Sequence, residues 1–352
     1  MHGGDIYDKD IRLDFSVNIN PLGMPESVLQ AAMRGVAHST QYPDVRNSRL
    51  RALFSERWEV PEESLFFGNG AAELLMTVLQ SDPTDRVILP IPSFQEYERA
   101  TVSIGSEISW ILLSEEKKYV LGEEELQQIL KEAEDAKNKG QSVAVLLGNP
   151  NNPTGQCVPR EILQQLSEAA EEKKFRLMID ESFLPFVPDE ETRTMRKTAA
   201  GSDQVVVLRS MTKIYGMPGL RAGVLVSGNR TLLENMEKKT QPWRLSLPAQ
   251  LAMEAAIQEP DWIEKTIRLM EDERTFLTEG LSRGLTRKIL AGDAPFLLVE
   301  PTVPDLKERL LREGILIRDC QNFRGMGSGY VRLGIRTREE NETLLNTWRN
   351  IV

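Results

Sequence analysis

The stretch Leu208-Arg-Ser-Met-Thr-Lys-Ile-Tyr-Gly-Met-Pro-Gly-Leu-Arg-Ala-Gly223 places a lysine, two hydroxyls and an arginine in and before a glycine-rich turn. It lies between two apolar runs, residues 205–208 and 224–226, and each run predicts a buried strand. A lysine held between two buried strands is expected to be partly desolvated, which lowers the pKa of its amine. Because a neutral amine is a nucleophile, Lys213 is the first candidate for a covalent role.

Phosphate-binding groups surround this lysine in the sequence. Ser210 and Thr212 supply hydroxyl donors, and Arg221 supplies a guanidinium that can grip a phosphate with two hydrogen bonds. A lysine nucleophile beside a phosphate site suits a small molecule that carries both an aldehyde and a phosphate, and pyridoxal 5′-phosphate (PLP) is such a molecule. The stretch therefore predicts that Lys213 binds PLP as a Schiff base. A surface lysine near a turn is the alternative that this stretch by itself leaves open.

The composition is that of a large globular protein with an acidic surface. The 352 residues are 40% hydrophobic, enough to bury a large core and to form two subdomains. A net charge of −10 and an isoelectric point near 5.1 argue against a nucleic-acid or anionic-membrane partner. No apolar run is long enough to span a membrane, no signal-peptide pattern is seen, and two cysteines are too few for a disulfide framework. We therefore expect a cytoplasmic protein, and we predict no metal site.

From residue 65 onward the sequence repeats a strand, a turn and a helix. This alternation is typical of an α/β fold with a mostly parallel sheet and helices on both faces. The expected strands are 65–67, 87–89, 108–113, 143–147, 177–179, 205–208 and 224–226. In such sheets ligands bind beyond the carboxyl ends of the strands, so the loops there are the candidate binding positions.

The chain changes character after residue 226. Long helices are expected first, and a smaller α+β unit follows them. The helices are 230–239, 248–257 and 261–281, and the unit has strands 296–300, 315–318 and 330–335 with helices 303–312 and 339–352. A polar arm over residues 1–12 and an alternating strand pattern over residues 13–20 precede the sheet. We therefore predict 1–45 as an N-terminal arm and part of the small domain, 46–250 as the large PLP-binding domain, and 251–352 as the small C-terminal domain.

Two polar residues stand at predicted strand ends. Asp180 closes an apolar strand, where a carboxylate is costly unless it is paired, and a pyridine nitrogen would pair with it. A helix N-cap is the alternative role for Asp180. Asn152 lies in the loop Asn151-Asn-Pro-Thr-Gly155, and its amide could donate to the phenolic oxygen of the cofactor. The alternative for Asn152 is an ordinary Asn-Pro turn.

Three further strand ends offer donors or an aromatic ring. Gly68-Asn-Gly-Ala-Ala72 precedes a helix, so its free N–H groups can bind phosphate with the helix dipole behind them. Phe94 follows another strand and could stack on the pyridine ring, although such a residue by itself is more often core. Arg318 and Arg332 lie on strands of the C-terminal unit and could clamp a carboxylate or a phosphate, unless they point to solvent.

Together these residues resemble the aspartate-aminotransferase-like PLP enzymes, known as fold type I. The resemblance extends in order over nearly the whole chain and implies their α/β fold. It implies Lys213 and Asp180 as catalytic residues, and as cofactor contacts Gly70, Ala71, Ala72, Phe94, Asn152, Asp180, Ser210, Thr212, Lys213 and Arg221. It also implies that Tyr42 reaches the cofactor phosphate of the neighbouring subunit, so that a homodimer shares its active sites. Arg332 corresponds to the family arginine that grips the substrate anion.

Within this family the chain resembles two groups, the histidinol-phosphate aminotransferases and the L-threonine-O-3-phosphate decarboxylases of cobalamin biosynthesis. The segments that resemble the decarboxylases are His2-Gly-Gly4, Asp14-Phe-Ser-Val-Asn-Ile-Asn-Pro-Leu-Gly23, Leu208-Arg-Ser-Met-Thr-Lys213 and Leu316-Ile-Arg-Asp-Cys320. Phe183 also resembles the decarboxylases, because the aminotransferases usually carry a tyrosine at this position. The resemblance implies decarboxylation of L-threonine O-3-phosphate to (R)-1-amino-2-propanol O-2-phosphate. The substrate-binding residues that it implies are His2, Gly3, Gly4, Asn20, Asn152, Arg318 and Arg332.

Several alternatives stay open from the sequence alone. The same residues serve decarboxylation and transamination, because the outcome depends on how the anion-binding groups orient the substrate. A histidinol-phosphate aminotransferase, an L-serine-phosphate decarboxylase and a PLP-binding protein without catalysis therefore compete with the first interpretation. A plain nucleotide-binding protein is disfavoured, because no Walker lysine or dinucleotide fingerprint follows the first strands. The sequence also does not assign Arg318, Arg332 and Arg336 individually to phosphate or carboxylate.

Overall fold

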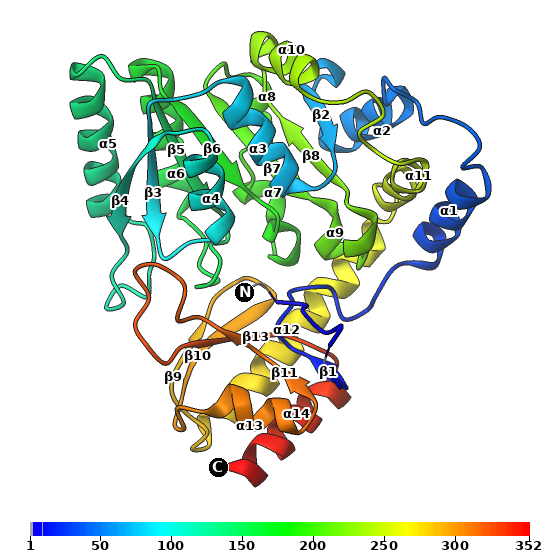
Figure 1. The fold of residues 1–352 in the computed structure, drawn as a ribbon, viewed down its shortest axis with the longest axis vertical. Coiled ribbons are helices and arrows are strands. Elements are labelled where there is room, and N and C mark those ends of the chain that lie inside the picture. The colour runs from blue at the N-terminus through cyan, green and yellow to red at the C-terminus, as the bar shows by residue number, and fades with distance from the viewer. Residues whose placement is uncertain (1–2, 9) are drawn as a thin grey trace.

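A seven-stranded sheet forms the centre of the larger part of the molecule (Figure 1). The computed structural model describes residues 3–8 and 10–352. The strand order is β2 (Leu65–Gly68), β8 (Gly223–Val226), β7 (Val205–Ser210), β6 (Arg176–Asp180), β5 (Val143–Gly148), β3 (Arg86–Ile91) and β4 (Glu107–Leu112). β8 runs antiparallel to both of its neighbours, and the other pairs are parallel. The predicted mostly parallel α/β sheet is confirmed.

Helices cover both faces of this sheet because its strands bury side chains on both sides. On β7, Val205 and Val207 belong to one apolar cluster, and Val206 and Leu208 belong to the other. The helices on the first face are α2 (Ser48–Trp58), α5 (Glu123–Asn138), α6 (Arg160–Lys173) and α8 (Arg196–Ala200). Those on the second face are α3 (Ala71–Ser81), α4 (Gln95–Ser103) and α10 (Arg230–Lys239).

The helix α1 (Glu26–Ala37) lies outside these layers and packs on α11 (Leu247–Ala256). Gly35 permits the close approach, because a Cβ atom there would lie 2.5 Å from the Cα of Pro248. The other face of α1 presents Leu29, Met33 and Val36 to solvent. α1 therefore has one apolar face that is buried within the chain and one that is not.

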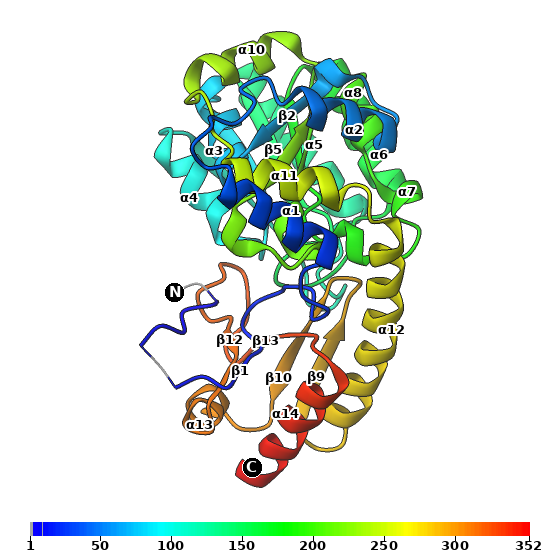
Figure 2. The ribbon, with the colours of Figure 1, turned by 90° about the vertical axis from the view of Figure 1, so that its right-hand side faces the viewer.

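A smaller body holds a four-stranded antiparallel sheet. Its order is β12 (Arg318–Asp319), β13 (Val331–Gly334), β10 (Phe296–Pro301) and β9 (Thr286–Ala291). The helices α13 (Leu306–Arg312) and α14 (Arg338–Ile351) belong to this body, and β1 (Leu13–Asp14) pairs in parallel with β11 (Ile315–Leu316) beside it. Figure 2 shows α12 (Pro260–Ser282) running from the larger body to the smaller one. The boundary that we predict at residue 250 falls inside α11, and the chain crosses between the bodies along α12.

Three strand regions differ from the sequence-based expectation. The strand expected over residues 315–318 is divided into β11 (Ile315–Leu316) and β12 (Arg318–Asp319), which belong to different sheets. β9 was not predicted, because Thr286–Ala291 mixes charged and apolar side chains and is largely exposed on one side. The strand expected over residues 13–20 is only two residues long. It ends where the Ser16 amide turns to donate to Asp14 Oδ1 at 2.8 Å instead of continuing a ladder. Among the helices that the structure describes, none has the length and apolar character needed to cross a membrane.

Candidate active site

The predicted site residues meet at one edge of the large sheet. Strand pairing aligns Gly68, Gly223 and Ser210 across β2, β8 and β7, and it aligns Gly148 with Asp180 across β5 and β6. Adjacent strands lie about 4.8 Å apart, so the two rows form one continuous edge. This edge holds the carboxyl ends of the parallel strands, where a ligand is expected.

Lys213 lies in the short helix α9 (Met211–Ile214), which directly follows β7. Its pKa is lowered from 10.5 to about 8, mainly by burial and then by the positive charges of Arg221 and Arg332, while Asp180 opposes the shift. These four groups are therefore close enough to interact electrostatically. At neutral pH about one tenth of such a lysine is the free amine, which is the nucleophilic form.

Two buried hydroxyls mark the start of the lysine segment. Ser210 Oγ lies 2.7 Å from Thr212 Oγ1. The Ser210 amide donates to Ser182 Oγ at 3.1 Å, which ties the end of β7 to the turn after β6. Because one hydroxyl donates to the other, the pair keeps one proton with which to bind an anion.

Gly70 and Arg221 form the other side of this anion-binding region. The φ angle of Gly70 is +96°, and a Cβ atom there would lie 2.6 Å from Arg221 Nη2. Gly70 precedes α3, whose first residues are Ala71 and Ala72, and the first N–H groups of a helix have no partner within the helix. A guanidinium, a helix start and two hydroxyls together fit a phosphate dianion.

Asp180 is held by two hydrogen bonds at the end of β6. The Ser182 amide donates to Oδ1 at 2.9 Å, and the Tyr97 hydroxyl donates to Oδ2 at 3.0 Å. Burial raises the pKa of Asp180, and the hydrogen bonds from the Ser182 side chain and amide and from Tyr97, together with the charge of Lys213, offset only part of that rise. A cationic pyridine nitrogen would supply a further counter-charge. The Ser182 contact is also the turn-opening bond of the alternative interpretation, and it is compatible with a cofactor contact, which stays a prediction.

Arg332, in β13 of the smaller body, lies near Lys213 at the same edge of the large sheet. Its Nη1 donates to Asn152 Oδ1 at 2.6 Å, and its Nη2 donates to the Ser16 carbonyl at 2.8 Å. The guanidinium carbon lies 5.2 Å from the centre of the Phe296 ring. Burial lowers the pKa of Arg332 to about 10, and its buried Nε lacks a hydrogen-bond partner in the described chain. This donor can therefore bond a ligand that reaches it.

Asn152 keeps its donors because it accepts from Arg332 with its oxygen. The side-chain NH₂ group is therefore available for the phenolic oxygen of a cofactor, as the sequence predicts.

Arg318, in β12, is the second cation that the smaller body contributes. Its Nη1 donates to the Asp319 carbonyl at 2.8 Å and its Nη2 to Asn322 Oδ1 at 3.0 Å. Its guanidinium carbon lies 5.2 Å from the Phe323 ring centre. In the described chain the hydrogen-bond partners of Arg318 and Arg332 are neutral oxygens. By contrast, several other buried arginines pair with carboxylates: Arg176 with Asp82, Arg196 with Glu190 and Arg209 with Glu181.

Two phenylalanines flank the Asp180 segment. Phe94 precedes α4, is half-buried and meets the Tyr97 ring edge-on at 5.6 Å. Phe183 is buried and meets Phe296 edge-on at 5.4 Å. Stacking of Phe94 on a cofactor stays a prediction. Phe183 contributes apolar contact alone, which leaves Asn152 as the side-chain candidate for the phenolic oxygen.

The N-terminal arm lies beside Arg332 through Ser16. The Gly4 amide donates to Ser16 Oγ at 2.9 Å, and a Cβ atom on Gly3 would lie 2.3 Å from the Ser16 carbonyl oxygen. That carbonyl also accepts from Arg332. Gly3 and Gly4 are therefore near the predicted substrate arginine, and His2 lies outside the described residues.

Asn20 has a different environment from the one that the resemblance implies. Its Nδ2 donates to the Ile214 carbonyl and to Thr266 Oγ1, both at 2.7 Å. Its Oδ1 accepts from the Leu22 amide at 3.0 Å, and its own amide donates to the Lys213 carbonyl at 3.0 Å. These hydrogen bonds brace α9, and a substrate contact of Asn20 stays a prediction.

Tyr42 lies on the surface of the single chain. Its ring is 78% exposed and stacks on Trp243 with 4.5 Å between the ring centres. A reach from Tyr42 into the site of a second subunit stays a prediction.

Comparison with known proteins agrees with this geometry. The model of a family described as aminotransferase class I and II matches residues 10–347. The chain belongs to this family. The crystal structure of the histidinol-phosphate aminotransferase from Clostridium acetobutylicum superposes with a TM-score of 0.87 at 27% identity, over 96% of this chain and 98% of that one. The predicted aspartate-aminotransferase-like fold is thereby confirmed.

Two relatives are more similar in sequence. Threonine-phosphate decarboxylase of Salmonella typhimurium is 33% identical over the whole of this chain and 96% of its own length. The adenosylcobalamin biosynthesis bifunctional protein CobDQ of Leptospira interrogans is 30% identical over 99% of this chain, which matches 41% of that longer protein. The regions aligned with these two relatives therefore span the residues of the candidate site.

Tyr97 contacts the candidate site through Asp180, and the sequence did not predict this contact. Along α4 it occupies one of the buried positions, together with Ala100 and Thr101, and so it resembles a core residue. A buried tyrosine hydroxyl needs a hydrogen-bond partner, and that need is the signal that could have identified it. Gln95 and Asn322, which bond to each other and flank Arg318, were also not predicted, because neither is part of a sequence pattern.

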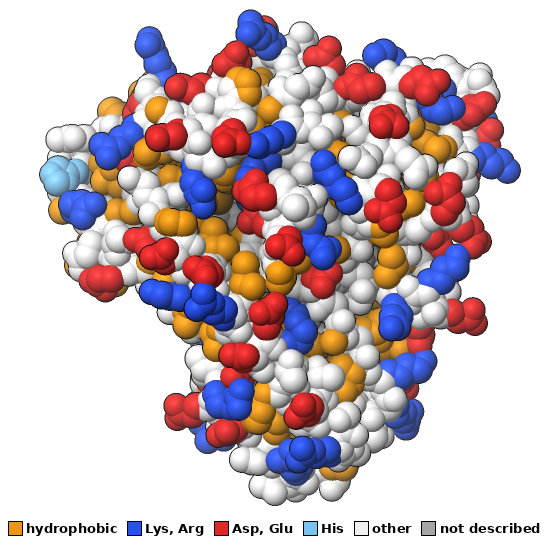
Figure 3. Space-filling model, turned by 180° about the vertical axis from the view of Figure 1, so that it is seen from behind, with side chains coloured by type: hydrophobic (Ala, Val, Ile, Leu, Met, Phe, Trp, Pro, Cys, Tyr) orange, Lys and Arg blue, Asp and Glu red, His pale blue; other side chains and the backbone are white. Residues whose placement is uncertain are grey.

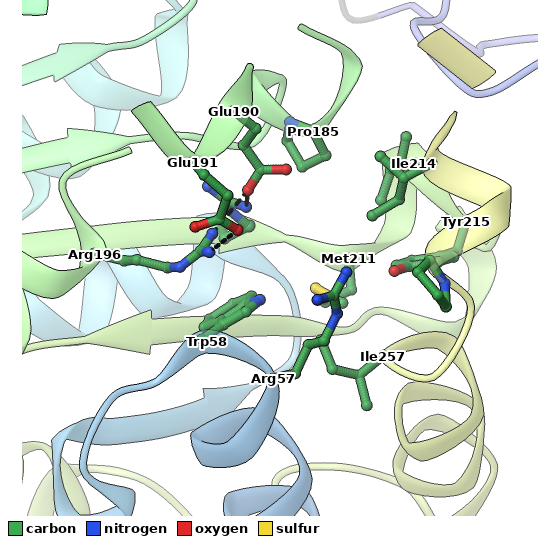
Figure 4. Close-up of a pocket in the computed structure, with 13 residues that line it drawn as sticks. Arg57, Trp58, Pro185, Glu190, Glu191, Arg196, Met211, Ile214, Tyr215 and Ile257 are labelled. Atoms are coloured by element: carbon green, nitrogen blue, oxygen red, sulfur yellow. Dashed lines mark hydrogen bonds and ion pairs between the residues drawn. The ribbon is translucent and has the colours of Figure 1, made fainter. Parts of the chain in front are cut away.

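A separate cavity lies behind the lysine helix (Figure 4). Met211, Ile214 and Tyr215 line it, together with an ion cluster in which Glu190 accepts from Arg196 and Arg209. Its volume is about 40 Å³, whereas small-molecule sites usually measure roughly 300–1,000 Å³. The cavity is therefore a packing feature that backs α9, and the candidate site is the strand edge described above.

Proposed function

We propose that this protein is a PLP-dependent carboxy-lyase that converts L-threonine O-3-phosphate to (R)-1-amino-2-propanol O-2-phosphate and carbon dioxide. The observation that carries the proposal is the pair of buried guanidiniums, Arg318 and Arg332, whose partners in the described chain are neutral oxygens. A substrate with one carboxylate and one phosphate supplies an anion for each. The similarity to the Salmonella decarboxylase supports this substrate, and the similarity to CobDQ supports a place in cobalamin biosynthesis.

The residues present fit PLP. The amine of Lys213 suits its aldehyde, the carboxylate of Asp180 suits its ring nitrogen, and the free amide of Asn152 suits its phenolic oxygen. The bare backbone at Gly70, where a Cβ atom would clash with the Arg221 guanidinium, suits its phosphate, with Arg221, Ser210 and Thr212 as donors. When bound, PLP supplies an electron sink for the bond that breaks at the α carbon of the substrate.

Lys213 has two tasks in this proposal. Its lowered pKa, about 8, provides free amine to hold the cofactor. Once the amine of the substrate has taken its place, Lys213 Nζ can move a proton to the α carbon. Asp180 holds a proton at the ring nitrogen of the cofactor, and the hydrogen bonds from Tyr97 and Ser182 keep its carboxylate in place.

The arginines decide which bond at the α carbon breaks, because they set the orientation of the substrate. Arg332 contacts Asn152, the predicted partner of the phenolic oxygen, so an anion bound there lies next to the α carbon. That anion is the carboxylate. Arg318, in the neighbouring strand β12, is held by Asn322 and Phe323 of the turn that follows this strand, and it takes the phosphate at the other end of the substrate.

A homodimer completes the proposal. The exposed large apolar residues of α1 are Leu29, Met33 and Val36, spaced so that they share one face of the helix. The exposed Tyr42–Trp243 stack adds two aromatic rings. Figure 3 shows apolar side chains exposed on the side of the molecule where α1 lies. Exposed apolar side chains gathered on one side of the molecule suit a second copy of the chain.

Carbon dioxide release tests the function. Purified protein with PLP and L-threonine O-3-phosphate should release carbon dioxide with no keto acid added. L-threonine without phosphate should react far more slowly, because Arg318 would be left without its anion. Amino transfer from glutamate to imidazole-acetol phosphate, with no carbon dioxide from threonine phosphate, would instead establish the function of the Clostridium relative. L-serine O-phosphate, run in parallel, shows whether the methyl group is required.

A further inference from the structure

Tyr97 touches the two predicted ring contacts of the cofactor at once. Its hydroxyl donates to Asp180 Oδ2 at 3.0 Å. The same ring packs edge-on against Phe94: the two ring centres lie 5.6 Å apart and the ring planes are at 90°. Tyr97 is 3% exposed, so neither contact competes with bulk water.

The path from Tyr97 to Asp180 crosses a strand that has no side chain at that point. Tyr97 lies on α4, which follows β3, whereas Asp180 ends β6, and β5 lies between these two strands. The residue of β5 that pairs with Asp180 is Gly148, and a Cβ atom on it would lie 3.0 Å from the Tyr97 oxygen. Glycine at this position leaves the space that the phenol occupies.

The direction of the hydrogen bond is fixed by chemistry. Burial and the charge of Asp180 raise the pKa of Tyr97 well above its ordinary value, so the phenol keeps its proton and donates. Asp180 Oδ1 accepts from the Ser182 amide, and the Ser182 hydroxyl is a further donor to this carboxylate. An ionised carboxylate has about four lone-pair sites, so it can still accept from a ring nitrogen.

We propose that Tyr97 is a positioning residue that holds the Asp180 carboxylate and the Phe94 ring in register for the cofactor ring. The proposal rests on the proposed binding of PLP, but it does not depend on which substrate reacts. A tyrosine in this place acts through Asp180 and Phe94, and it has no contact with the reacting atoms.

The test compares Tyr97→Phe with Tyr119→Phe in the PLP-bound enzyme. Tyr119 is a matched control, because its buried hydroxyl also faces a carboxylate, Glu115, at 3.3 Å. Both variants keep the ring and lose one hydroxyl. We expect Tyr97→Phe to weaken PLP binding and to lower kcat by about 10-fold with little change in KM, since a hydrogen bond to a charged group is lost. Tyr119→Phe should match the wild type in both quantities.

A spectroscopic measurement separates positioning from general damage. The visible absorbance of lysine-bound PLP titrates with pH, and its midpoint depends on the charge held at the ring nitrogen. We expect the midpoint to move in Tyr97→Phe and to stay in Tyr119→Phe, while the thermal midpoints of the two apo-proteins stay similar. In Gly148→Ala the added methyl group presses on the phenol from β5. This variant should shift the absorbance midpoint in the same direction as Tyr97→Phe.

Equal absorbance midpoints and equal PLP affinities in the two phenylalanine variants would overturn the proposal. Because these readouts need no turnover, they remain informative even if the enzyme proves to catalyse amino transfer. A failure of the Tyr97 proposal is therefore distinguishable from a failure of the proposed function.

Discussion

Arg332→Lys keeps the positive charge of the buried cation and removes its planar fork. In the structure two of its three nitrogens are engaged, Nη1 with Asn152 and Nη2 with the Ser16 carbonyl, and Nε is free. A lysine ammonium is a point charge and cannot bond Asn152, Ser16 and a carboxylate in one plane. We therefore expect the substrate to lose at least one charge-assisted hydrogen bond.

The expected magnitude follows from that loss. A hydrogen bond to a charged group contributes about 1.5–3 kcal/mol, which corresponds to a fall of about 10- to 150-fold in kcat/KM for L-threonine O-3-phosphate. The PLP absorbance should change little, because the predicted cofactor donors are intact. The assay is steady-state carbon dioxide release, with PLP content measured on the same samples.

Arg338→Lys is the matched control. Arg338 also lies over an aromatic ring, Phe276 at 4.0 Å, and pairs with Glu273, but its side chain is half exposed. Its replacement should leave kcat/KM near the wild-type value. A kcat/KM for Arg332→Lys within about threefold of wild type would refute the assignment of Arg332 to the substrate.

Three further predictions address the cofactor and the dimer. Only the neutral amine reacts, so PLP incorporation into the apo-protein should accelerate as the pH rises towards about 8 and then level off. Borohydride should fix the cofactor on Lys213. Acceleration that continues to about pH 10 would indicate an ordinary lysine. Asp180→Asn should retain PLP but lose most turnover, since its carboxylate is the buried counter-charge for the ring, and near-normal rates would reduce Asp180 to its turn contact with Ser182. Mixed dimers of Tyr42→Ala and Lys213→Ala should regain activity, because one site then keeps both residues; no recovery on mixing would place Tyr42 in its own subunit's site or outside any site.

The sheet and the position of the site could be predicted because the signals are local. Buried parallel strands are continuous apolar runs, and residues at their carboxyl ends converge whatever the connections between them. Lys213, Asp180 and Asn152 follow such runs, so their roles could be proposed from the sequence. β9 carries charged side chains on an exposed side and gave no such signal.

The contacts that join distant segments could not be predicted in the same way. The Tyr97–Asp180 bond spans 83 residues and depends on the strand order, with Gly148 between the two. Asn20 fits a substrate pattern in the sequence, yet its amide finds Ile214 and Thr266, which lie 194 and 246 residues away. A polar side chain near a site can brace the scaffold or bind a ligand, and only the fold decides which.

Carboxyl-labelled L-threonine O-3-phosphate tests the central claim most directly. The PLP-bound enzyme, supplied with this compound and no keto acid, should release the label as carbon dioxide, with one equivalent of aminopropanol phosphate for each equivalent released. Retention of the label in a keto acid, with amino-group transfer and no labelled carbon dioxide, would contradict the account.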